Sequence, residues 1–497
     1  MKLEVKDMDI SSGGALVAVL NGKDADKMDL HSLDRIKIIK GNRIETVVLD
    51  IGTSKRAVGK GKIGLYEEVL ASLKLKDKDI VKIVPARKPL SLEHIKKKLE
   101  GFRLTKKEID QIVWDIVHNK LSSVELTYFV AACFSNELNL KETTWLTEAM
   151  TSYGDILKLK RYPILDKHCI GGVAGNRTTM IIVPILAAAG VTIPKTSSRS
   201  ITSPAGTADT MEVLADVSIP IKKMKKIVEK INGCIVWGGA LNLAPADDRI
   251  IRVERPLAID AESQLLASVM AKKASVSATH VLIDIPVGKG AKLTTKKEAL
   301  KLKKNFKNLA KRLKIKIRII ITEGKEPIGN GIGPALEARD VLWILDSNIN
   351  SAFNLRSKSL RMAGLMLEMA GKAVKGKGYT MAREILESRK AYKKMIEIIN
   401  MQGKKIINPH KIKLGKVTYD FVSKKTGVVK EISSKTISKI ARVAGAPEDE
   451  GAGIYLHKHI GNKVKKGDKL YTVYCRNKSK MEYAKYAIEK LDGFVVG

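Results

Sequence analysis

The sequence predicts a multidomain α/β protein, and three observations support this fold class. A chain of 497 residues is long enough for about three or four domains. Residues before about Pro85 follow the pattern of short strands, and a series of capped helices comes next. From Ile164 onwards, apolar strands alternate with helices, which is typical of a parallel sheet. We therefore expect a β-rich N-terminal domain, a helical domain, a mixed α/β domain and a C-terminal α+β domain.

Composition limits the kind of partner. Hydrophobic residues make up 44% of the chain and charged residues 29%, so each domain can bury a core and disorder is not expected. The chain has 90 Lys and Arg residues against 53 Asp and Glu residues, a formal net charge of +37. This charge favours an anionic partner, whether nucleic acid, a phosphorylated small molecule or a membrane surface.

Cysteine spacing and the N-terminus indicate the compartment. The four cysteines are far apart and form no CxxC or Cys/His zinc pattern, which predicts free thiols in a reducing compartment and no bound metal. The N-terminal residues have no apolar signal-peptide core. The longest uncharged stretch, 178–194, is too short for a membrane span and contains Pro184. We expect a soluble cytoplasmic protein without a membrane partner.

The β-rich segment contains two clear strand patterns. Residues 35–38 alternate in polarity and residues 44–51 are rich in Val and Ile, with a Gly-Asn turn at 41–42 between them. A short helix is expected near 66–73. This segment has no cluster of catalytic residue types.

The helical segment is defined by its start signals. Thr105, Ser122 and Asn139 each precede a Glu by three positions, which is the spacing of a capping box. Ser91 is expected to cap a helix over 92–99. These signals predict a compact helical unit.

The β/α pattern that follows predicts a βαβ unit. Residues 281–287 and 315–321 are apolar runs typical of buried parallel strands, and a Lys-rich helix over 295–313 joins them. Residues 341–345 are a candidate for a third strand. A last unit, which contains a Lys-Gly-Asp turn and a strand within 463–474, completes the chain.

A first candidate site lies at 166–179, where a basic pair precedes a Gly-Gly loop and the start of a helix. Glycine lets backbone amides approach an anion, and a helix N-terminus adds partial positive charge. Lys167 and His168 supply further donors. Thr178 and Thr179 either bind phosphate oxygens or only cap their helix. The segment matches neither the GxGxxG nor the GxxxxGK[ST] pattern.

A second candidate site is the segment 197–203, which holds five hydroxyl residues, one Arg and no acid. Hydroxyl and guanidinium groups donate hydrogen bonds without adding negative charge, so this composition suits a loop around an anion. A Ser/Thr-rich loop that caps the helix after Pro204 explains the pattern equally well.

A third candidate site combines a helix and a loop. Asp260 and Ser268 are about two helical turns apart and can share one face, although Asp260 is also a good N-cap. The loop 288–292 follows a predicted strand, and its Lys289 or Lys292 can reach an anion there. An ordinary turn with solvated lysines is the alternative.

Together these segments resemble the thymidine phosphorylase superfamily of nucleoside phosphorylases. The family pattern Ser-x-Arg, followed by Gly-Thr-x-Asp-x-apolar-Glu, matches residues 197–199 and 206–212. Residues 166–172 match the family's phosphate loop, and 244–247 and 267–272 match its base-side helix. The resemblance covers roughly the whole chain after the β-rich segment.

Departures from the family pattern point to one branch. Members that act on pyrimidine nucleosides have Gly where Ser200 stands and His-Thr near Ser203, whereas this loop has more anion donors. An extra β-rich domain precedes the helices. Both features resemble an archaeal branch that cleaves AMP. The resemblance implies a glycosyltransferase (pentosyltransferase) that uses inorganic phosphate to convert AMP, and also CMP and UMP, into free base and ribose 1,5-bisphosphate during nucleotide salvage.

The resemblance also implies site residues. Asp260 matches the proton donor. The residues expected to bind AMP or phosphate are Gly172, Ser198, Arg199, Ser200, Ile201, Thr202, Ser203, Thr207, Ser268 and Lys292. Lys167, Thr178 and Thr207 are expected nearer the attacking phosphate, but reasoning from the residues alone does not assign either loop to either phosphate. No metal or cofactor is implied.

The same resemblance implies the domain organisation. It predicts a helical domain that is discontinuous in sequence, a cleft against the α/β domain and a homodimer or larger homo-oligomer. The expected domains are 1–85 (β-rich), 88–160 with 245–276 (helical), 161–244 with 277–405 (α/β, phosphate-binding) and 406–497 (α+β).

Three other interpretations compete with this one. A thymidine or pyrimidine nucleoside phosphorylase acts on uncharged nucleosides, which the hydroxyl-rich loop and Lys292 disfavour. An anthranilate-type phosphoribosyltransferase shares the architecture, but its Gly-Thr-Gly-Gly-Asp loop is missing. An RNA-binding protein would suit the net charge of +37, but the basic residues are spread along the chain and aromatic residues are only 5%. We therefore expect no specific nucleic-acid partner.

Overall fold

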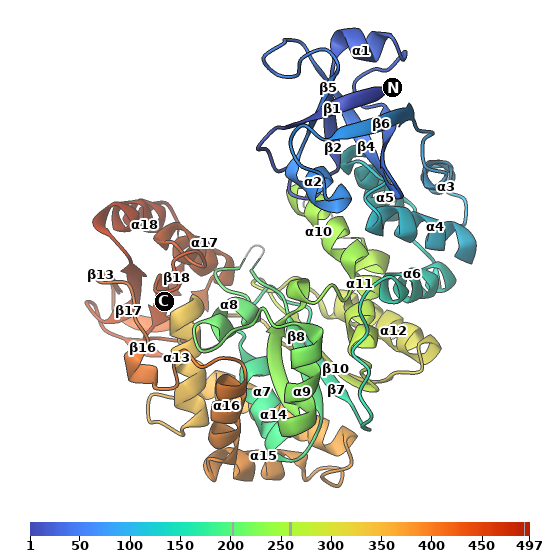
Figure 1. Ribbon diagram of the computed structural model, residues 1–497. Coiled ribbons are helices and arrows are strands. Elements are labelled where there is room, and N and C mark those ends of the chain that lie inside the picture. The colour runs from blue at the N-terminus through green and yellow to red at the C-terminus, as the bar shows by residue number, and fades with distance from the viewer. Residues whose placement is uncertain (201–202, 258–260, 492) are drawn as a thin grey trace. The chain divides into compact units, whose positions relative to one another are not determined.

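The computed structural model describes residues 1–200, 203–257, 261–491 and 493–497 (Figure 1). These residues form two compact units, and each is described by itself. The first unit comprises residues 1–153 and 245–268, and the second comprises 154–244 and 269–497. Each unit contains both helices and strands, as expected for a multidomain α/β protein.

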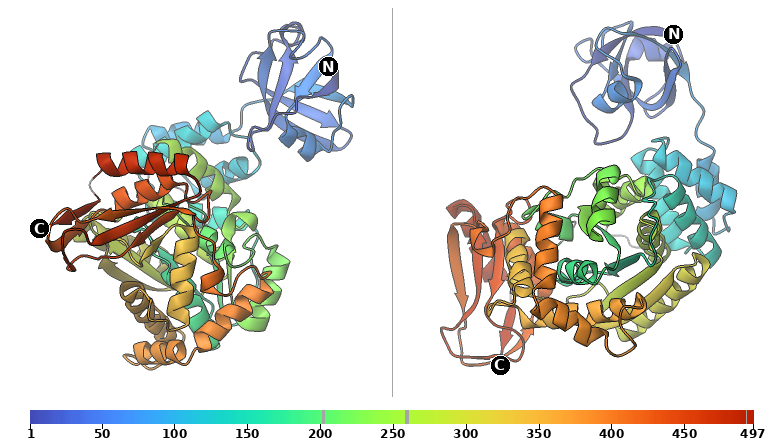
Figure 2. Two further views of the ribbon diagram at one scale, coloured as in Figure 1. Left: turned by 90° about the vertical axis from the view of Figure 1, so that its left-hand side faces the viewer. Right: turned by 60° about the horizontal axis from the view of Figure 1, so that its bottom comes forward.

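A closed six-stranded barrel forms the N-terminal part of the first unit (Figure 2). Around the barrel the order is β1-β5-β2-β4-β3-β6. Alternate residues such as Ile36 and Ile38 are buried, as the period of two in a strand requires. The elements are β1 Lys2–Asp7, β2 Val17–Asn21, α1 Gly22–Asp26, β3 Arg35–Lys40, β4 Arg43–Gly52, β5 Lys62–Leu65, α2 Glu67–Leu73 and β6 Ile80–Pro85. The predicted strands at 35–38 and 44–51 and the helix near 66–73 are confirmed.

Helices make up the rest of the first unit. They are α3 Ser91–Leu99, α4 Lys106–Val117, α5 Ser123–Ser135, α6 Leu140–Ser152 and α10 Pro245–Leu257, which packs against α5. The capping boxes of Thr105, Ser122 and Asn139 are all formed, so the predicted starts of α4, α5 and α6 are confirmed. The predicted cap of α3 is wrong. Leu90 occupies the cap position, and Ser91 lies inside the helix with its hydroxyl buried.

The second unit is built on parallel strands. β10 His280–Val287 lies between β7 Leu165–Cys169 and β11 Lys316–Glu323, and all three run parallel. β8 Ile193–Ser197 and β9 Gly233–Trp237 form a second parallel pair, and a parallel bridge between Ile164 and Thr192 joins this pair to β7. α12 Lys296–Arg312 connects β10 to β11, which confirms the predicted βαβ unit. Nearly all of β10 is buried, as expected for a strand with both faces covered.

Helices surround these strands. They are α7 Thr178–Ala188, α8 Thr207–Glu212, α9 Ile221–Ile231, α11 Glu262–Ser275, α13 Pro334–Leu345, α14 Phe353–Met369, α15 Gly378–Glu387 and α16 Lys390–Met401, with a 3₁₀ turn at Gly238–Ala240. α11 begins in the first unit and ends in the second. α7 is apolar, and both α7 and α13 are buried on nearly all sides, so neither helix has the polar, solvent-exposed face that reveals a helical period in a sequence.

The predicted strand at 341–345 is wrong, because these residues form the last turns of α13. Gly333 adopts a positive φ of 123° and Pro334 occupies the first position of the helix. A short, fully buried apolar run has the same appearance in a strand and in a buried helix. The helix start signal, Gly-Pro ahead of the run, would have distinguished the two.

Two small sheets with two helices complete the second unit. Figure 2 shows α17 Ser434–Ala444 and α18 Lys478–Lys490 together on one side of these strands. The four-stranded sheet has the order β12 Gly331–Ile332, β15 Gly453–Leu456, β17 Lys469–Cys475 and β13 Val417–Val422. The three-stranded sheet has the order β16 Lys463–Val464, β14 Gly427–Ile432 and β18 Phe494–Val496, and a 3₁₀ turn lies at Pro409–Lys411. Among the described residues, the helices are all too short or too polar to cross a membrane.

Candidate active site

The sequence-predicted loops all follow parallel strands of the second unit. The glycine loop (170–177) follows β7, the hydroxyl loop (198–206) follows β8, and the lysine loop (288–295) follows β10. Because β7 and β10 are parallel neighbours and β8 is bridged to β7, these loops leave the carboxyl edge of the strands. Ligands of open α/β sheets bind at this edge.

The glycine loop packs closely on the lysine loop. Gly171 and Gly172 adopt positive φ angles of 97° and 92°, which side chains other than glycine rarely accept. A Cβ atom on Gly172 would lie 2.3 Å from the backbone nitrogen of Lys292, so any larger residue would push the loops apart. The backbone N–H of Lys292 also donates to the carbonyl oxygen of Gly171, over 3.4 Å. The structure thus brings together two predicted site residues, Gly172 and Lys292.

Lys167 lies beneath the glycine loop and is buried. Its Nζ donates to the Thr178 hydroxyl over 2.9 Å. Burial lowers the pKa of Lys167, although nearby Cys169 and Asp284 oppose this shift. An ammonium group that is held here by a neutral hydroxyl can stabilise an incoming anion.

Asp284 and Lys358 support Lys167, and sequence reasoning did not identify either residue. Lys358 Nζ lies 3.0 Å from Asp284 Oδ2, and the Thr322 hydroxyl donates to Asp284 Oδ1 over 2.6 Å. Burial disfavours the charge on Asp284, but Lys358 and Lys167 outweigh it and lower its pKa. Asp284 is separated from Lys167 by more than 100 residues, so only the pairing of β7 with β10 brings the two together.

A second buried charge cluster lies at the start of β7. Asp166 is fully buried and pairs with Lys273 over 2.6 Å and with Lys195 over 3.4 Å. Burial lowers the pKa of Lys273 to about 8. Burial and these lysines together hold the pKa of His168 well below its ordinary value, so His168 is neutral at neutral pH.

Side chains of α8, the helix that follows the hydroxyl loop, hold this loop by hydrogen bonds and ion pairs. Asp209 Oδ2 accepts the backbone N–H groups of Ser200, over 2.7 Å, and Gly206, over 2.8 Å. Arg199 pairs with Asp209 over 3.2 Å and with Glu212, and its hydrogen bond to Glu212 raises the pKa of Arg199. The loop therefore has carboxylates beside it, although its own residues include no acid.

The hydroxyl groups of this loop partly bond to the loop itself. Ser203 Oγ donates to the carbonyl oxygen of Ala205 over 3.0 Å, and Ser200 Oγ donates to the carbonyl oxygen of Ser203. The backbone N–H of Ala208 donates to the carbonyl oxygen of Ser198 over 3.2 Å. Among the described residues of the loop, these hydrogen bonds join side-chain and backbone groups of 198–200 to those of 203–208.

Arg177 links the two loops, and sequence reasoning assigned it no role. This residue occupies the cap position of α7 and is buried. Its guanidinium donates to the Thr207 hydroxyl over 3.0 Å and to the carbonyl oxygen of Ala205 over 3.1 Å. Its position between the Gly-Gly pair and two threonines is the one signal that could have drawn attention to it.

The predicted residues are distributed as follows. Seven lie at this edge of the second unit: Gly172, Ser198, Arg199, Ser200, Ser203, Thr207 and Lys292. Ser268 lies in α11 within the first unit. Ile201, Thr202 and the expected proton donor Asp260 lie outside the described residues.

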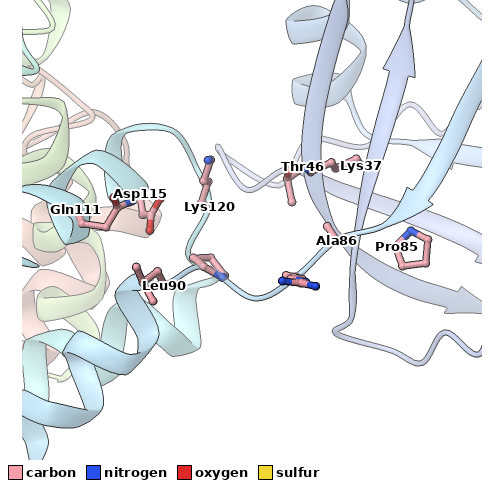
Figure 3. A pocket seen from close by; sticks show the side chains of 10 residues that line it. Lys37, Thr46, Pro85, Ala86, Leu90, Gln111, Asp115 and Lys120 are labelled. Carbon is pink, nitrogen blue, oxygen red and sulfur yellow. The ribbon is translucent and has the colours of Figure 1, made fainter.

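A cavity of 430 Å³ lies in the first unit. Figure 3 shows its lining side chains, with Lys37 and Thr46 on the barrel and Gln111, Asp115 and Lys120 on the helical side. None of the predicted site residues lines it.

One acidic group with metal-like spacing occurs on the barrel surface. It is formed by Asp7, Asp9 and Glu67. Among the described residues, no such group lies at the three loops.

Family models match three segments of the chain. Residues 92–154 match the helical bundle domain of a glycosyl transferase family, and residues 161–391 match the a/b domain of that family. Residues 428–492 match the pyrimidine nucleoside phosphorylase C-terminal domain.

Curated relatives match the chain over nearly its whole length. A protein named AMP phosphorylase from Pyrococcus furiosus is 47% identical over 493 residues, which cover 99% of this chain and 97% of that protein. Proteins of the same name from Thermococcus kodakarensis and Methanococcoides burtonii are 46% and 43% identical, and this chain is covered to 97% and 100%.

Solved structures match the fold. Anthranilate phosphoribosyltransferase from Thermus thermophilus aligns with a TM-score of 0.52 at 18% identity, covering 62% of this chain and 98% of that chain. The enzyme of the same name from Saccharomyces cerevisiae, in complex with PRPP and Mg, gives a TM-score of 0.51 at 14% identity, covering 63% and 97%. At this identity the likeness concerns the fold alone.

Proposed function

Because the chain belongs to the AMP phosphorylase family, we propose that it cleaves AMP with inorganic phosphate. The bond between adenine and C1′ of the ribose breaks, and a bond forms between C1′ and a phosphate oxygen. The products are adenine and ribose 1,5-bisphosphate, so the enzyme is a pentosyltransferase. CMP and UMP carry the same ribose 5′-phosphate, and we include them as further substrates.

The observation that carries this proposal is the presence of two separate sets of anion donors at one edge of the sheet. Lys167 and Thr178 lie under the glycine loop, and the hydroxyl loop follows the neighbouring strand β8. A reaction between AMP and phosphate needs two anion sites, one for the attacking phosphate and one for the 5′-phosphate. We assign Lys167, Thr178 and Thr207 to the attacking phosphate, and residues 198–203 with Lys292 to the 5′-phosphate.

The chemistry requires electrostatics and one acid. As the glycosidic bond breaks, the ribose gains oxocarbenium character, as in glycoside hydrolysis. The attacking phosphate is the nucleophile, so the protein need not supply one. The leaving adenine is a poor anion, and we propose that Asp260 protonates it. Replacing Asp260 by Asn should lower kcat by about 10²–10⁴-fold, the usual size of general acid catalysis, while leaving thermal stability nearly unchanged.

The test of the proposed function compares AMP with adenosine. The purified protein is incubated with phosphate and either substrate, and free base is measured by chromatography. A charge-assisted hydrogen bond contributes about 1.5–3 kcal/mol, so several contacts to the 5′-phosphate should favour AMP by more than about tenfold in kcat/KM. Equal turnover of AMP and adenosine would contradict this function and would favour a phosphorylase for uncharged nucleosides.

We also propose that the protein acts in the cytoplasm as a homodimer or larger homo-oligomer, as the resemblance to its superfamily implies. Sedimentation equilibrium of the purified chain tests the assembly. A single species at the mass of one chain, 54.6 kDa, would contradict it.

A further inference from the structure

Arg177 lies where it can control one hydroxyl group of the site. It is only 7% exposed, at the start of α7, and its side chain reaches across to the hydroxyl loop. One terminal nitrogen, Nη1, donates to Thr207 Oγ1 over 3.0 Å, and the other, Nη2, donates to the carbonyl oxygen of Ala205 over 3.1 Å. The planar guanidinium therefore fixes both ends of the segment 205–207.

Glu337 holds Arg177 from the opposite side. Glu337 belongs to α13 and is 1% exposed, and its Oε2 lies 2.5 Å from Arg177 Nε. The backbone N–H of Gly333 donates to Glu337 Oε1 over 3.0 Å. The Thr210 hydroxyl donates to the carbonyl oxygen of Gly206 over 2.9 Å and lies 3.4 Å from Glu337 Oε2. The carboxylate is thus anchored at the start of α13 independently of Arg177, so it can orient the guanidinium.

The direction of the hydrogen bond between Arg177 and Thr207 determines whether the Thr207 hydroxyl can donate to another group. A guanidinium has donors and no acceptor, so the Thr207 oxygen must accept from Arg177. The single hydroxyl proton is then directed away from Arg177. A threonine held in this way is a donor for an incoming anion, and the neighbouring positive charge strengthens that donor.

We propose that Arg177 is a positioning residue, backed by Glu337, that orients the Thr207 hydroxyl as a donor to the attacking phosphate. This inference rests on the proposed function, because it takes phosphate as the anion that Thr207 binds. Two N–H groups of the Arg177 guanidinium donate to Thr207 and Ala205, and Nε lies beside the Glu337 carboxylate as an ion pair without a hydrogen bond, so Arg177 acts on the anion through Thr207.

The charges around Glu337 are consistent with this role. Burial raises the pKa of Glu337 to about 7, opposed by Arg177 and by the Gly333 N–H group. Asp340, one turn further along α13, adds to the rise, and Thr210 of α8 opposes it. Above neutral pH the carboxylate is ionised and pairs with Arg177, and below it the pair weakens.

The test is a double-mutant cycle read through separate KM values for phosphate and AMP. The variants are Arg177→Lys, Thr207→Val and the double variant. Lys keeps the positive charge of Arg177 but lacks the planar set of N–H groups that contacts Thr207 and Ala205 together. Val keeps the shape of Thr207 but lacks the hydroxyl. Each single change should raise KM for phosphate about tenfold or more, with a much smaller change in KM for AMP. The double variant should be no worse than the poorer single variant.

A control and a second variant keep the test decisive. Arg318→Lys alters a more exposed Arg–Glu pair on β11, 3.0 Å to Glu368, and should change neither KM. Glu337→Gln repeats the test with an uncharged residue of the same shape if Arg177→Lys fails to fold, and should also raise KM for phosphate selectively.

Three outcomes would overturn the inference. Additive effects in the double variant would mean that Arg177 acts independently of Thr207. Equal rises in both KM values, or a change in Tm alone, would mean a merely structural role. An inactive wild-type protein would instead refute the proposed function, so the two failures are distinguishable.

Discussion

The glycine loop after β7 and the hydroxyl loop after β8 both carry predicted anion donors, but they hold these donors in opposite ways. Under the glycine loop, Lys167 is buried and its ammonium group donates to a threonine hydroxyl. In the hydroxyl loop, the one cation, Arg199, is partly exposed and pairs with two carboxylates of α8. The first loop has a buried cation beneath it, whereas the second has one cation beside two carboxylates.

This difference shows that the sequence reveals which residues can donate hydrogen bonds, but not which of those donors already have partners within the protein. A buried cation that is held by a neutral hydroxyl is preorganised for an anion, and such fixed charges are the strongest electrostatic contributors at reacting centres. A loop of hydroxyls and backbone amides binds an anion more weakly and discriminates by shape. We therefore associate the glycine loop with the attacking phosphate and the hydroxyl loop with the nucleotide's own phosphate.

The largest expected effect is on stability, and it compares the fully buried Asp166 of β7, which leads into the glycine loop, with Asp209, which supports the hydroxyl loop. Asp166→Asn leaves two buried lysines without their counter-charge and should destabilise the fold by about 3–5 kcal/mol. Asp209→Asn weakens both the pair with the partly exposed Arg199 and the backbone hydrogen bonds from Ser200 and Gly206, and should cost less, about 1–3 kcal/mol. Urea unfolding of both variants measures the difference. Equal losses would show that the burial of the ion pair does not determine the cost of losing its carboxylate.

The next effect concerns catalysis. Lys167→Met keeps much of the side-chain length but removes the charge, and should raise KM for phosphate by about tenfold or more, since a hydrogen bond to a charged group contributes about 1.5–3 kcal/mol. Arg199→Met serves as the comparison and should affect phosphate much less, because its charge is already matched by carboxylates. A larger phosphate defect in Arg199→Met would reverse the assignment of the loops.

Lys292 provides a sharper test of substrate charge. Lys292→Ala should lower kcat/KM for AMP by about tenfold, the value of one charge-assisted contact, and leave any turnover of adenosine nearly unchanged. The measurement is the ratio of kcat/KM values for AMP and adenosine in the variant and the wild type. An equal loss for both substrates would mean that Lys292 supports the glycine loop and does not bind the 5′-phosphate.

The smallest effect is a pH dependence at the junction of the two loops. The pKa of Glu337 is raised to about 7, above its ordinary value of 4.5. The folded protein therefore binds this proton more tightly than the unfolded chain does. The resulting contribution to the free energy of unfolding is present at low pH and is lost as pH rises through 7. The Tm of wild type minus that of Glu337→Gln should therefore fall between about pH 5 and pH 8. A difference that is constant, or that grows with pH, would contradict a raised pKa.

Local features of the fold were predictable from the sequence, because their signals lie within a few residues. Thr105, Ser122 and Asn139 form the expected capping boxes, and the apolar run at 281–287 lies within β10. The run at 341–345 was assigned to a strand and is helical, because a buried helix hides its period.

The candidate site was predictable only in part, because its supporting groups are far apart in the sequence. Gly172 and Lys292 were expected and do meet. Arg177 and Glu337 are 160 positions apart, and no local pattern pairs them. The sequence of the hydroxyl loop, which contains no acid, also gave no sign that Arg199 would pair with Glu212 of α8. Such contacts depend on the packing of whole elements.

The central claim is that two different loops hold two different phosphates. The most direct measurement is a crystal structure of the protein with AMP and with sulfate as an unreactive substitute for the attacking phosphate. We expect sulfate within hydrogen-bond distance of Lys167 and Thr207, and the 5′-phosphate against residues 198–203 and Lys292. A 5′-phosphate bound to Lys167, or both anions on the same loop, would contradict it.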